Sequence, residues 1–498
     1  MTFTTTRSTD SSEPVSSSYT NHDQEDPLHY FKIDLFQPEV QEYLVQVMEL
    51  KEDGGECLKK ALQTPPNIST VRVNMLHFRK NSMDEKKSND EIMEQVRKKL
   101  SEILEHKYEV KRDENVPDCL TIPVKKLYPS FENITEFIVV DRLCGQAVLR
   151  GAHVFSPGVL ATSKNIRVNS VVGVLCDVQS QTLKGFKFEK SISEMLSSSS
   201  NNNFIYIGNG IIKMERANIF QTRKGVALEV TQPLFETCPL NDLSQKYYHE
   251  FFAQNICSMV VSHLLEPQRG DKILDMCAAP GGKTTHIANL MQDGELICCD
   301  RQKSKVDKLI KLRDQLGFHM MKPMVLDGTK ATRRIQDLTS LASNDMDSQD
   351  LQKTENASQN FLEEEYFDKV LVDAPCSGLG QRPSLSFNEF SLDSLRKTAE
   401  YQRKLLSEAF KVLKPGGVLV YSTCTINPME NEENVMWLLN QYQSKIELVE
   451  PNLRAYASEG LPSIIKDPSI RSKVLRFDPI RTPQTIGFFA AKFMKKML

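Results

Sequence analysis

Short apolar runs separated by helical stretches fill the chain from about residue 231 to its end. Each run is only a few residues long, and most of them end in an acidic residue or a polar turn. Runs that are apolar throughout, rather than alternating, are typical of a parallel sheet covered by helices on both faces. We therefore predict an α/β fold, with a last strand pair that includes residues 486–493. The other runs begin at Lys272, Glu295, Pro323, Asp368 and Gly417.

Three segments of different character precede this part of the chain. Residues 1–27 are Ser/Thr-rich and acidic, which predicts a disordered tail. Residues 28–128 combine helical periodicity at 38–48 and 92–104 with a strand-like alternation at 69–76, so we expect a small α/β flank. Residues 129–230 contain short β-rich runs separated by glycines, which suggests a small barrel. We expect residues 231–498 to form the α/β domain, in which the acidic stretch 340–365 reads as a surface loop insertion.

Composition sets broad limits on the class of protein. A chain of 498 residues with 40% apolar content can bury a large core in two or three domains. The formal charge of −3 does not indicate a nucleic-acid binder, so any attraction for phosphate must come from local clusters of Lys and Arg. Eleven cysteines without a hydrophobic signal segment indicate reduced thiols, and we expect a cytoplasmic monomer. We predict no metal site and no membrane span, because paired Cys-x-x-Cys spacing with histidines and long apolar runs are absent from the sequence.

A glycine-rich turn follows the first apolar run and leads into a helix that we expect to begin near Thr284. Glycines let the backbone approach a ligand closely, and the amides at the start of a helix favour a polar or anionic group such as a methionine carboxylate. Asp300 closes the next strand, where an acid can accept hydrogen bonds from ribose hydroxyls, and Asp327 ends a third strand where it could meet an adenine. The candidate cofactor-binding residues are Cys277, Ala278, Ala279, Pro280, Gly281, Gly282, Lys283, Asp300, Lys305, Asp327 and Asp373.

Two other interpretations of this turn are open. Gly282-Lys-Thr matches the end of the phosphate-binding P-loop pattern, but the first glycine of that pattern should stand where this chain has Cys277. A side chain at that position would crowd the phosphate cradle. A glycine-rich turn without a ligand is the second alternative. Lys283 could orient a base or a cofactor, whereas Lys305 is as easily a solvated surface residue.

Two cysteines, Cys376 in Asp373-Ala-Pro-Cys and Cys424 in Ser422-Thr-Cys, lie where apolar runs break into polar turns. Open parallel sheets bind ligands at the carboxyl ends of their strands, and a thiolate placed there can attack C6 of a pyrimidine. Such an attack makes C5 nucleophilic enough to accept a methyl group. Asp373 is placed to protonate N3 as the adduct forms. From chemistry alone, either thiol could attack.

The cofactor turn and the two cysteine motifs together resemble the Nop2/Sun family of RNA cytosine-5 methyltransferases. The resemblance implies a Rossmann-like methyltransferase sheet that binds S-adenosyl-L-methionine, with Cys424 as the nucleophile and Cys376 assisting product release. It covers residues 231–498 strongly and the N-terminal quarter weakly, where the family carries an RRM-like flank. One departure is that residues 385–390 lack a tryptophan often found in that loop. A catalytically silent RNA-binding factor with the same fold is the alternative from another class.

The segment from Cys144 to Gly158 resembles the opening of a PUA domain, a pseudobarrel that grips acceptor stems or CCA ends in RNA-modifying enzymes. A member of the same family carries a PUA module in this place, which implies a tRNA partner and a target cytosine in the acceptor stem near the CCA end. A β insertion that serves only packing is the alternative. Basic side chains would meet phosphates, and an exposed aromatic ring could stack on an unpaired base. The candidate RNA-binding residues are Arg150, Phe155, Lys164, Lys184 and Lys187.

Overall fold

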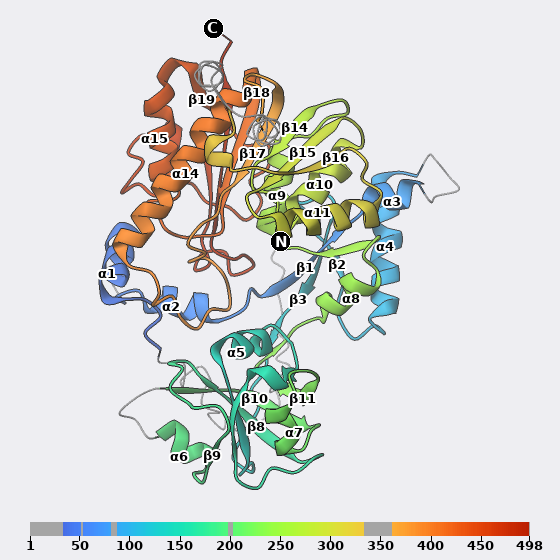
Figure 1. Cartoon of the computed structure of the whole chain (residues 1–498), viewed down its shortest axis with the longest axis vertical. Helices are drawn as coiled ribbons and strands as arrows, with labels where there is room; N and C mark the ends of the chain where they lie inside the picture. The colour runs from blue at the N-terminus through green and yellow to red at the C-terminus, as the bar shows by residue number, and fades with distance from the viewer. Residues whose placement is uncertain (1–32, 51–52, 81–86, 198–202, 333–360, 498) are drawn as a thin grey trace, which may run out of the picture.

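The computed structural model describes residues 33–50, 53–80, 87–197, 203–332 and 361–497 (Figure 1). The predicted tail at 1–27 and most of the predicted insertion at 340–365 lie outside these ranges. Figure 1 shows the C-terminal sheet with its helices at one end of the molecule and a second, separate sheet at the other. Within the described ranges, no helix combines the length and the apolar character that crossing a membrane requires.

The C-terminal sheet has the strand order β16-β15-β14-β17-β18-β21-β19, with β20 also paired to β21. The first five strands are parallel to one another, as predicted. The predicted parallel sheet is mixed at its other edge, because β21 runs antiparallel to β18, β19 and β20. The strands are β14 (Lys272–Asp275), β15 (Glu295–Asp300), β16 (Met321–Val325), β17 (Phe367–Asp373), β18 (Leu413–Thr423), β19 (Ile446–Leu448), β20 (Val474–Phe477) and β21 (Phe488–Lys495).

Helices cover this sheet on both faces, which explains why its strands are apolar throughout. Ile273 and Leu371 face one apolar cluster, whereas their neighbours Leu274 and Val370 face another. The first cluster includes side chains from α9 (Ile256–Leu264), α10 (Gly282–Met291) and α11 (Lys303–Leu316). The second includes side chains from α14 (Leu392–Val412) and α15 (Glu432–Tyr442). The short helix α16 (Pro468–Arg471) precedes β20.

The N-terminal flank contains a four-stranded antiparallel sheet in the order β13-β1-β3-β2. The strand-like alternation expected over residues 69–76 is wrong at its end, because the strand stops at Val73 and a helix begins at Met75. The predicted helices at 38–48 and 92–104 are confirmed, with Pro38 at the first helical position and a Ser88–Glu91 capping box at the start of the second. The elements are α1 (Pro38–Val47), α2 (Glu56–Gln63), β1 (Ile68–Val73), α3 (Met75–Lys80), α4 (Asn89–Ile103), β2 (Lys111–Arg112), β3 (Cys119–Pro123), α8 (Leu240–Lys246) and β13 (Phe251–Ala253).

Between these two parts, a seven-stranded sheet has the order β6-β11-β10-β8-β5-β7-β9. The pairs β5–β8 and β7–β9 are parallel and the others antiparallel. The chain enters and leaves this segment through the paired strands β4 (Lys125–Lys126) and β12 (Phe235–Glu236). The elements are β5 (Phe137–Val140), α5 (Arg142–Leu149), β6 (Val154–Phe155), β7 (Val159–Ser163), β8 (Val171–Asp177), β9 (Phe186–Phe188), α6 (Ile192–Ser197), β10 (Phe204–Ile212), α7 (Arg216–Gln221) and β11 (Val226–Pro233).

The seven-stranded sheet contacts the C-terminal part through α5. The Gln146 amide lies 3.5 Å from the Ser384 hydroxyl. Leu385, in the loop that lacks the expected tryptophan, is fully buried in the apolar cluster of the seven-stranded sheet. Phe387, two residues later, stacks on Phe36 with ring centroids 5.5 Å apart. This loop therefore packs against both N-terminal segments.

Candidate active site

The glycine-rich turn connects β14 to α10, which begins at Gly282, two residues before the predicted start. Gly281 precedes the helix with a φ of +109°, in the left-handed region that glycine tolerates best, and a Cβ there would meet Leu312 at 2.7 Å. At Gly282 a Cβ would meet nothing nearer than 3.9 Å. The first amides of a helix have no partner within it, so the start of α10 can bind a polar or anionic group.

Asp275 lies beneath the turn, at the end of β14, and is 1% exposed. Burial raises its pKa to about 7. The Thr284 hydroxyl lies 2.7 Å from Oδ2 of Asp275, while Oδ1 is buried without a hydrogen-bond partner in the described structure. An unpartnered buried acceptor beside the loop fits a ligand that brings its own donor, such as the ammonium group of S-adenosylmethionine. The sequence predictions did not include Asp275, although its position at a strand end was a signal for it.

Asp300 is the last residue of β15, and Asp327 lies two residues after β16. The Leu326 amide donates to the Asp300 carbonyl at 3.1 Å, so the two acids lie close together. The Asp300 side chain accepts from the Gln302 amide at 2.9 Å. Although burial raises the pKa of Asp327, hydrogen bonds from Thr329 lower it, so this side chain is a carboxylate. Both acids thus offer acceptors near the cofactor turn. Lys305, half-exposed, lies 3.7 Å from Asp300, and its ammonium group partly neutralises that acid.

The two cysteines predicted at strand ends lie side by side. Cys424 directly follows β18, Cys376 lies three residues after β17, and their sulfur atoms are 3.0 Å apart. The Cys424 amide also donates to Cys376 Sγ at 3.3 Å. The hydrogen bond from Cys376 lowers the pKa of the Cys424 thiol against the effect of burial, and a hydrogen bond from Gln381 lowers it further. The charge of Asp373 raises this pKa, and the charge of Lys283 lowers it. The same hydrogen bond and burial raise the pKa of Cys376. Cys424 is therefore the thiol that ionises first.

Lys283 joins the cofactor turn to the thiols. Its ammonium group donates to Asp373 Oδ2 at 2.8 Å, and the Ser422 hydroxyl donates to the other oxygen at 2.7 Å. Burial alone would lower the pKa of Lys283, but the charge of Asp373 and this hydrogen bond raise it. The turn, the acids and both cysteines therefore form one continuous site at the carboxyl ends of β14, β15, β17 and β18.

A buried carboxylate that the sequence predictions missed ties the two cysteine loops together. Glu430 accepts hydrogen bonds from the Ser377 amide at 3.0 Å and the Ser377 hydroxyl at 2.5 Å, next to Cys376. It also accepts from Asn427 at 2.9 Å and from Gln402 at 2.8 Å. Burial raises its pKa. In sequence, Glu430 reads as one more acid near the start of a helix, so nothing distinguished it from its neighbours.

The five predicted RNA-binding residues are absent from this site and lie exposed on the seven-stranded sheet and its loops. Phe155 is 52% exposed. Lys184 donates at 3.1 Å to the carbonyl of Pro157, two residues after Phe155 in the chain. Lys164 pairs with Glu189 at 3.3 Å, so part of its charge is already neutralised. Lys187 lies on β9, and Arg150 follows α5.

The comparisons with known proteins agree with this arrangement. The family model described as 16S rRNA methyltransferase RsmB/F matches residues 262–494. The chain is 34% identical to the tRNA (cytosine(72)-C(5))-methyltransferase NSUN6 of Homo sapiens over 497 residues, or 92% of this chain and 97% of that protein. It is 31% identical to the tRNA (cytosine(72)-C(5))-methyltransferase of Pyrococcus horikoshii, over 93% of this chain and 98% of that one.

Solved structures extend the likeness to the cofactor. The crystal structure of NSun6 from Pyrococcus horikoshii with SFG, an S-adenosylmethionine analogue, superimposes with a TM-score of 0.70 and 30% identity. It covers 93% of this chain and 99% of that one. The likeness therefore includes the flank and the seven-stranded sheet as well as the methyltransferase core. The chain belongs to the RsmB/F, or Nop2/Sun, family and is an S-adenosylmethionine-dependent RNA cytosine-5 methyltransferase.

Proposed function

We propose that this enzyme forms 5-methylcytosine in the acceptor stem of tRNA, near the CCA end, through a covalent cysteine adduct. The observation that carries the proposal is the pair of thiols 3.0 Å apart at one edge of the sheet, of which only Cys424 has a lowered pKa. The similarity to two tRNA (cytosine(72)-C(5))-methyltransferases over more than nine-tenths of each chain supports the choice of substrate.

Cys424 is the proposed nucleophile. Its thiolate adds to C6 of the cytosine, a bond forms between sulfur and C6, and the electrons of the C5=C6 bond move to C5. Bound S-adenosylmethionine supplies the sulfonium methyl group. A base then removes the proton from C5, the C5=C6 bond is restored, and the bond from C6 to Cys424 sulfur breaks.

Cys376 is proposed to act at the release step. In the free enzyme its pKa is raised by its hydrogen bond to Cys424 and by burial, with the charge of Cys424 adding to the effect. Once the Cys424 sulfur is bonded to C6 it carries no charge and is a poor acceptor, so two of these causes weaken. The amide of Cys424 still donates to Cys376 Sγ at 3.3 Å and favours its thiolate. The pKa of Cys376 therefore falls when the adduct forms. Its thiolate is then available as the base that removes the C5 proton.

Asp373 is proposed to face N3 of the cytosine and to carry a proton to it as the adduct forms. In the structure its carboxylate accepts from Lys283 at 2.8 Å, and the proton that it passes to N3 comes from this ammonium group. Residues Cys277–Lys283, Asp300 and Asp327 are proposed to hold S-adenosylmethionine, with Lys305 beside Asp300. The unpartnered Oδ1 of Asp275 is added to this set as the acceptor for its ammonium group.

The seven-stranded sheet is proposed to be a PUA module within residues 129–230, after an RRM-like flank at 28–128. The contact of α5 with residues 384 and 385 and the paired strands β4 and β12 fix its distance from the catalytic domain, 231–498. A tRNA end held on this module would therefore reach the active site at a set position. The target cytosine must be unpaired and swung out, which costs a few kcal/mol and is easiest for a terminal pair that frays.

Bisulfite sequencing of tRNA methylated in vitro tests the proposed target. We expect the signal in the acceptor stem, and a weak signal from tRNA that lacks its CCA tail. A signal confined to the anticodon or variable loop and indifferent to the CCA tail would contradict the tRNA position but not the chemistry. Charge reversal at Arg150 and Lys184 together should weaken tRNA binding and reduce its salt dependence, with unchanged cofactor affinity. An unchanged salt slope would place the RNA surface elsewhere.

A further inference from the structure

Helix α10, which begins at the cofactor turn, presents a polar stripe to the N-terminal flank. Gly282, Thr285, His286 and Asn289 follow the spacing i, i+3, i+4 and i+7, which places them on one face of the helix. The side chains of Thr285 and His286 are 0% exposed and that of Asn289 is 5% exposed. A stripe buried against a neighbouring sheet is ordinarily apolar. Here each polar position is matched by a group from the flank.

Arg72 on β1 makes the largest share of these contacts and is 1% exposed. Its guanidinium donates to the Gly282 carbonyl at 2.6 Å, to Thr285 Oγ1 at 2.9 Å and to Gln254 Oε1 at 2.7 Å. It also lies over the Phe252 ring, 4.2 Å from the centroid. Burial lowers the pKa of Arg72 to about 9, so it remains charged at neutral pH. A buried cation next to a helix N-terminus opposes the helix dipole, so packing alone does not account for it.

Asp118, just before β3, supplies the matching negative charge. Its two carboxylate oxygens lie 2.6 Å from His286 Nε2 and 2.9 Å from His263 Nε2. These three side chains have ligand atoms within 4.8 Å of one another, but the oxygen-to-nitrogen distances are those of hydrogen bonds. A hydrogen-bonded triad therefore explains the cluster. One turn further along α10, the Leu76 amide donates to Asn289 at 2.9 Å.

The first turn of α10 is thus held from two sides. Lys283 and Thr284 point into the candidate active site, where they bond Asp373 and Asp275. Gly282 and Thr285, on the other side of the same turn, bond Arg72. Any rotation or shift of this turn that breaks the Arg72 contacts would also move the side chains that line the cofactor site.

We propose that Arg72 is a positioning residue for S-adenosylmethionine, and that its contacts with the first turn of α10 make the N-terminal flank a required part of the cofactor site. The inference rests on the proposed assignment of the turn before α10 to the cofactor. It predicts that the flank acts on cofactor affinity and not only on RNA binding.

Calorimetric titration with S-adenosylhomocysteine tests this inference in the full-length enzyme. Arg72→Met should raise the Kd about tenfold, because the first turn of α10 loses its contacts with the flank and part of the binding free energy must then order this turn. Arg72→Lys should fall between the wild type and Arg72→Met, because a single ammonium keeps the charge but cannot bridge the same acceptors. Thr285→Val, a milder change that keeps the side-chain shape, should raise the Kd several-fold. Arg97→Lys, on α4 of the same flank, is the matched control and should leave the Kd unchanged.

Steady-state kinetics and the comparison variant Asp300→Ala distinguish an effect on cofactor positioning from a loss of stability. The Arg72 and Thr285 variants should raise KM for S-adenosylmethionine more than they lower kcat, whereas loss of folded protein would lower kcat alone. Asp300→Ala, at the proposed ribose contact, should weaken S-adenosylhomocysteine binding independently. Unchanged Kd in folded Arg72→Lys and Thr285→Val variants, with Asp300→Ala weakened, would overturn the inference and leave the cofactor site in place. Unchanged binding in Asp300→Ala as well would overturn the assignment of the site itself.

Discussion

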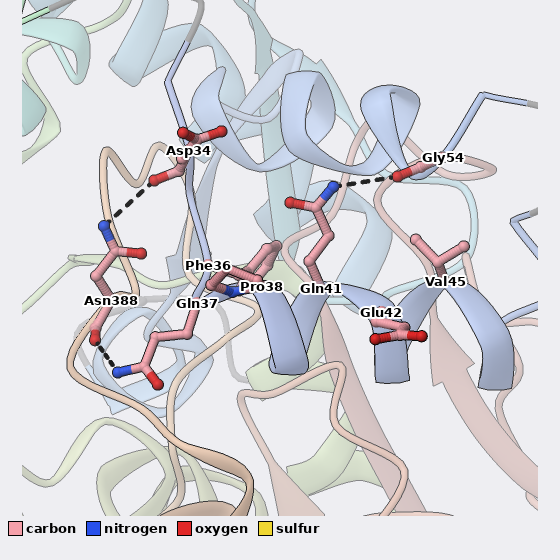
Figure 2. Close-up of a pocket in the computed structure, with 9 residues that line it drawn as sticks. All are labelled: Asp34, Phe36, Gln37, Pro38, Gln41, Glu42, Val45, Gly54 and Asn388. Carbon is pink, nitrogen blue, oxygen red and sulfur yellow. Dashed lines mark hydrogen bonds between the residues drawn. The ribbon is translucent and has the colours of Figure 1, made fainter. Parts of the chain in front are cut away.

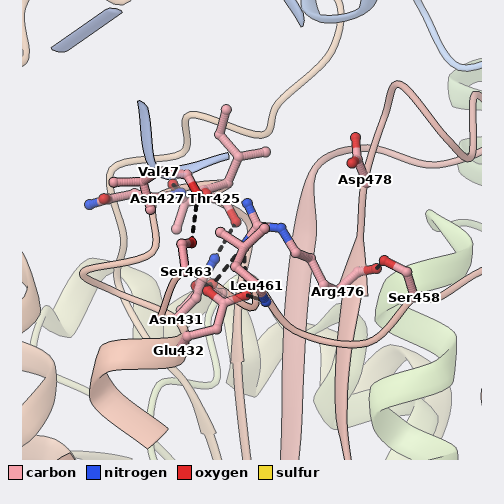
Figure 3. A network of polar contacts seen from close by, with 12 residues as sticks. Val47, Thr425, Asn427, Asn431, Glu432, Ser458, Leu461, Ser463, Arg476 and Asp478 are labelled. Carbon is pink, nitrogen blue, oxygen red and sulfur yellow. Dashed lines mark hydrogen bonds and ion pairs between the residues drawn. The ribbon is translucent and has the colours of Figure 1, made fainter. Parts of the chain in front are cut away.

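Breaking the buried ion pair between Arg476 and Glu432 should destabilise the protein and disorder the loop that carries Cys424. Figure 3 shows this pair, in which Arg476 Nη1 lies 3.0 and 3.1 Å from the two Glu432 oxygens. Arg476 Nη2 donates at 2.7 Å to the carbonyl of Ile426, two residues after the nucleophile. The side chains are 3% and 0% exposed, so neither charge can be hydrated if its partner is lost.

The expected magnitude follows from this burial. Arg476→Met removes all three hydrogen bonds and leaves Glu432 with the Leu461 amide, 3.2 Å away, as its remaining donor from the surrounding segments. Removing one partner of a buried pair costs about 3–5 kcal/mol in the free energy of unfolding. Adding Glu432→Gln removes the stranded charge, so the double variant should be less destabilised than the sum of the two single variants.

Urea denaturation of the wild type, the two single variants and the double variant gives the coupling energy between Arg476 and Glu432. The matched control is Arg481→Met, because Arg481 is 73% exposed and lies 3.8 Å from Asp478. We expect the control to change the free energy of unfolding by less than about 1 kcal/mol. Arg476→Met should also lower kcat, with the affinity for S-adenosylhomocysteine nearly unchanged, because the cofactor turn lies on other elements. A loss of stability no larger than that of the control, or additive single effects, would refute the reasoning.

Two further predictions concern the thiols and the buried carboxylate of Glu430. Glu430→Gln replaces an acceptor of four hydrogen bonds by a group with one acceptor oxygen. We therefore expect kcat to fall at least about tenfold, with unchanged binding of S-adenosylhomocysteine. An equal loss of kcat and of binding would indicate general unfolding. The pH profile of Cys424 alkylation by iodoacetamide should have its inflection below the ordinary thiol pKa of about 8.5, since a lowered pKa exposes the thiolate earlier as pH rises. The inflection should move to higher pH in Cys376→Ala and in Lys283→Met, and an inflection that stays in place would contradict the proposed source of the shift.

The sequence predicted the parts of the fold that local pattern controls. The run at Glu295–Asp300 became β15 with the same limits, because a short stretch that is apolar on both faces fits only an interior strand. The antiparallel direction of β21 could not be predicted from its apolar residues, because strand direction depends on the path of the chain between strands. The sequence predicts the start of α10 near Thr284, whereas the helix begins at Gly282, where the backbone carbonyl accepts from Arg72.

Contacts between distant segments explain most of what the sequence did not reveal about the site. Arg72 and Gly282 are 210 residues apart, and neither local spacing nor composition links them. The contacts of Glu430 likewise join residues that are distant in sequence, Ser377 and Gln402, so its role could not be predicted from its neighbours in the chain. The proximity of Cys376 and Cys424 was predictable because the carboxyl ends of neighbouring parallel strands meet at one edge of a sheet.

A hollow lies between α1 and the loop after Gly380. Figure 2 shows it lined by Asp34, Gln37 and Gln41 on the N-terminal side and by Asn388 on the catalytic side. The Gln37 amide donates to the Asn388 carbonyl at 2.7 Å, and the Asn388 amide donates to the Asp34 carbonyl at 3.4 Å. These bonds hold the N-terminal segment against the loop that contains Leu385 and Phe387.

Trapping of the covalent RNA complex tests the central claim most directly. Enzyme, tRNA and S-adenosylmethionine are mixed, denatured and separated by gel electrophoresis, and the cross-linked peptide is identified by mass spectrometry. Cys376→Ala should accumulate a denaturant-resistant complex joined through Cys424, because attack proceeds while release is slowed. Cys424→Ala should give no complex and no methyl transfer. A complex that forms with Cys424→Ala and is joined through Cys376 would contradict the proposed roles of the two thiols.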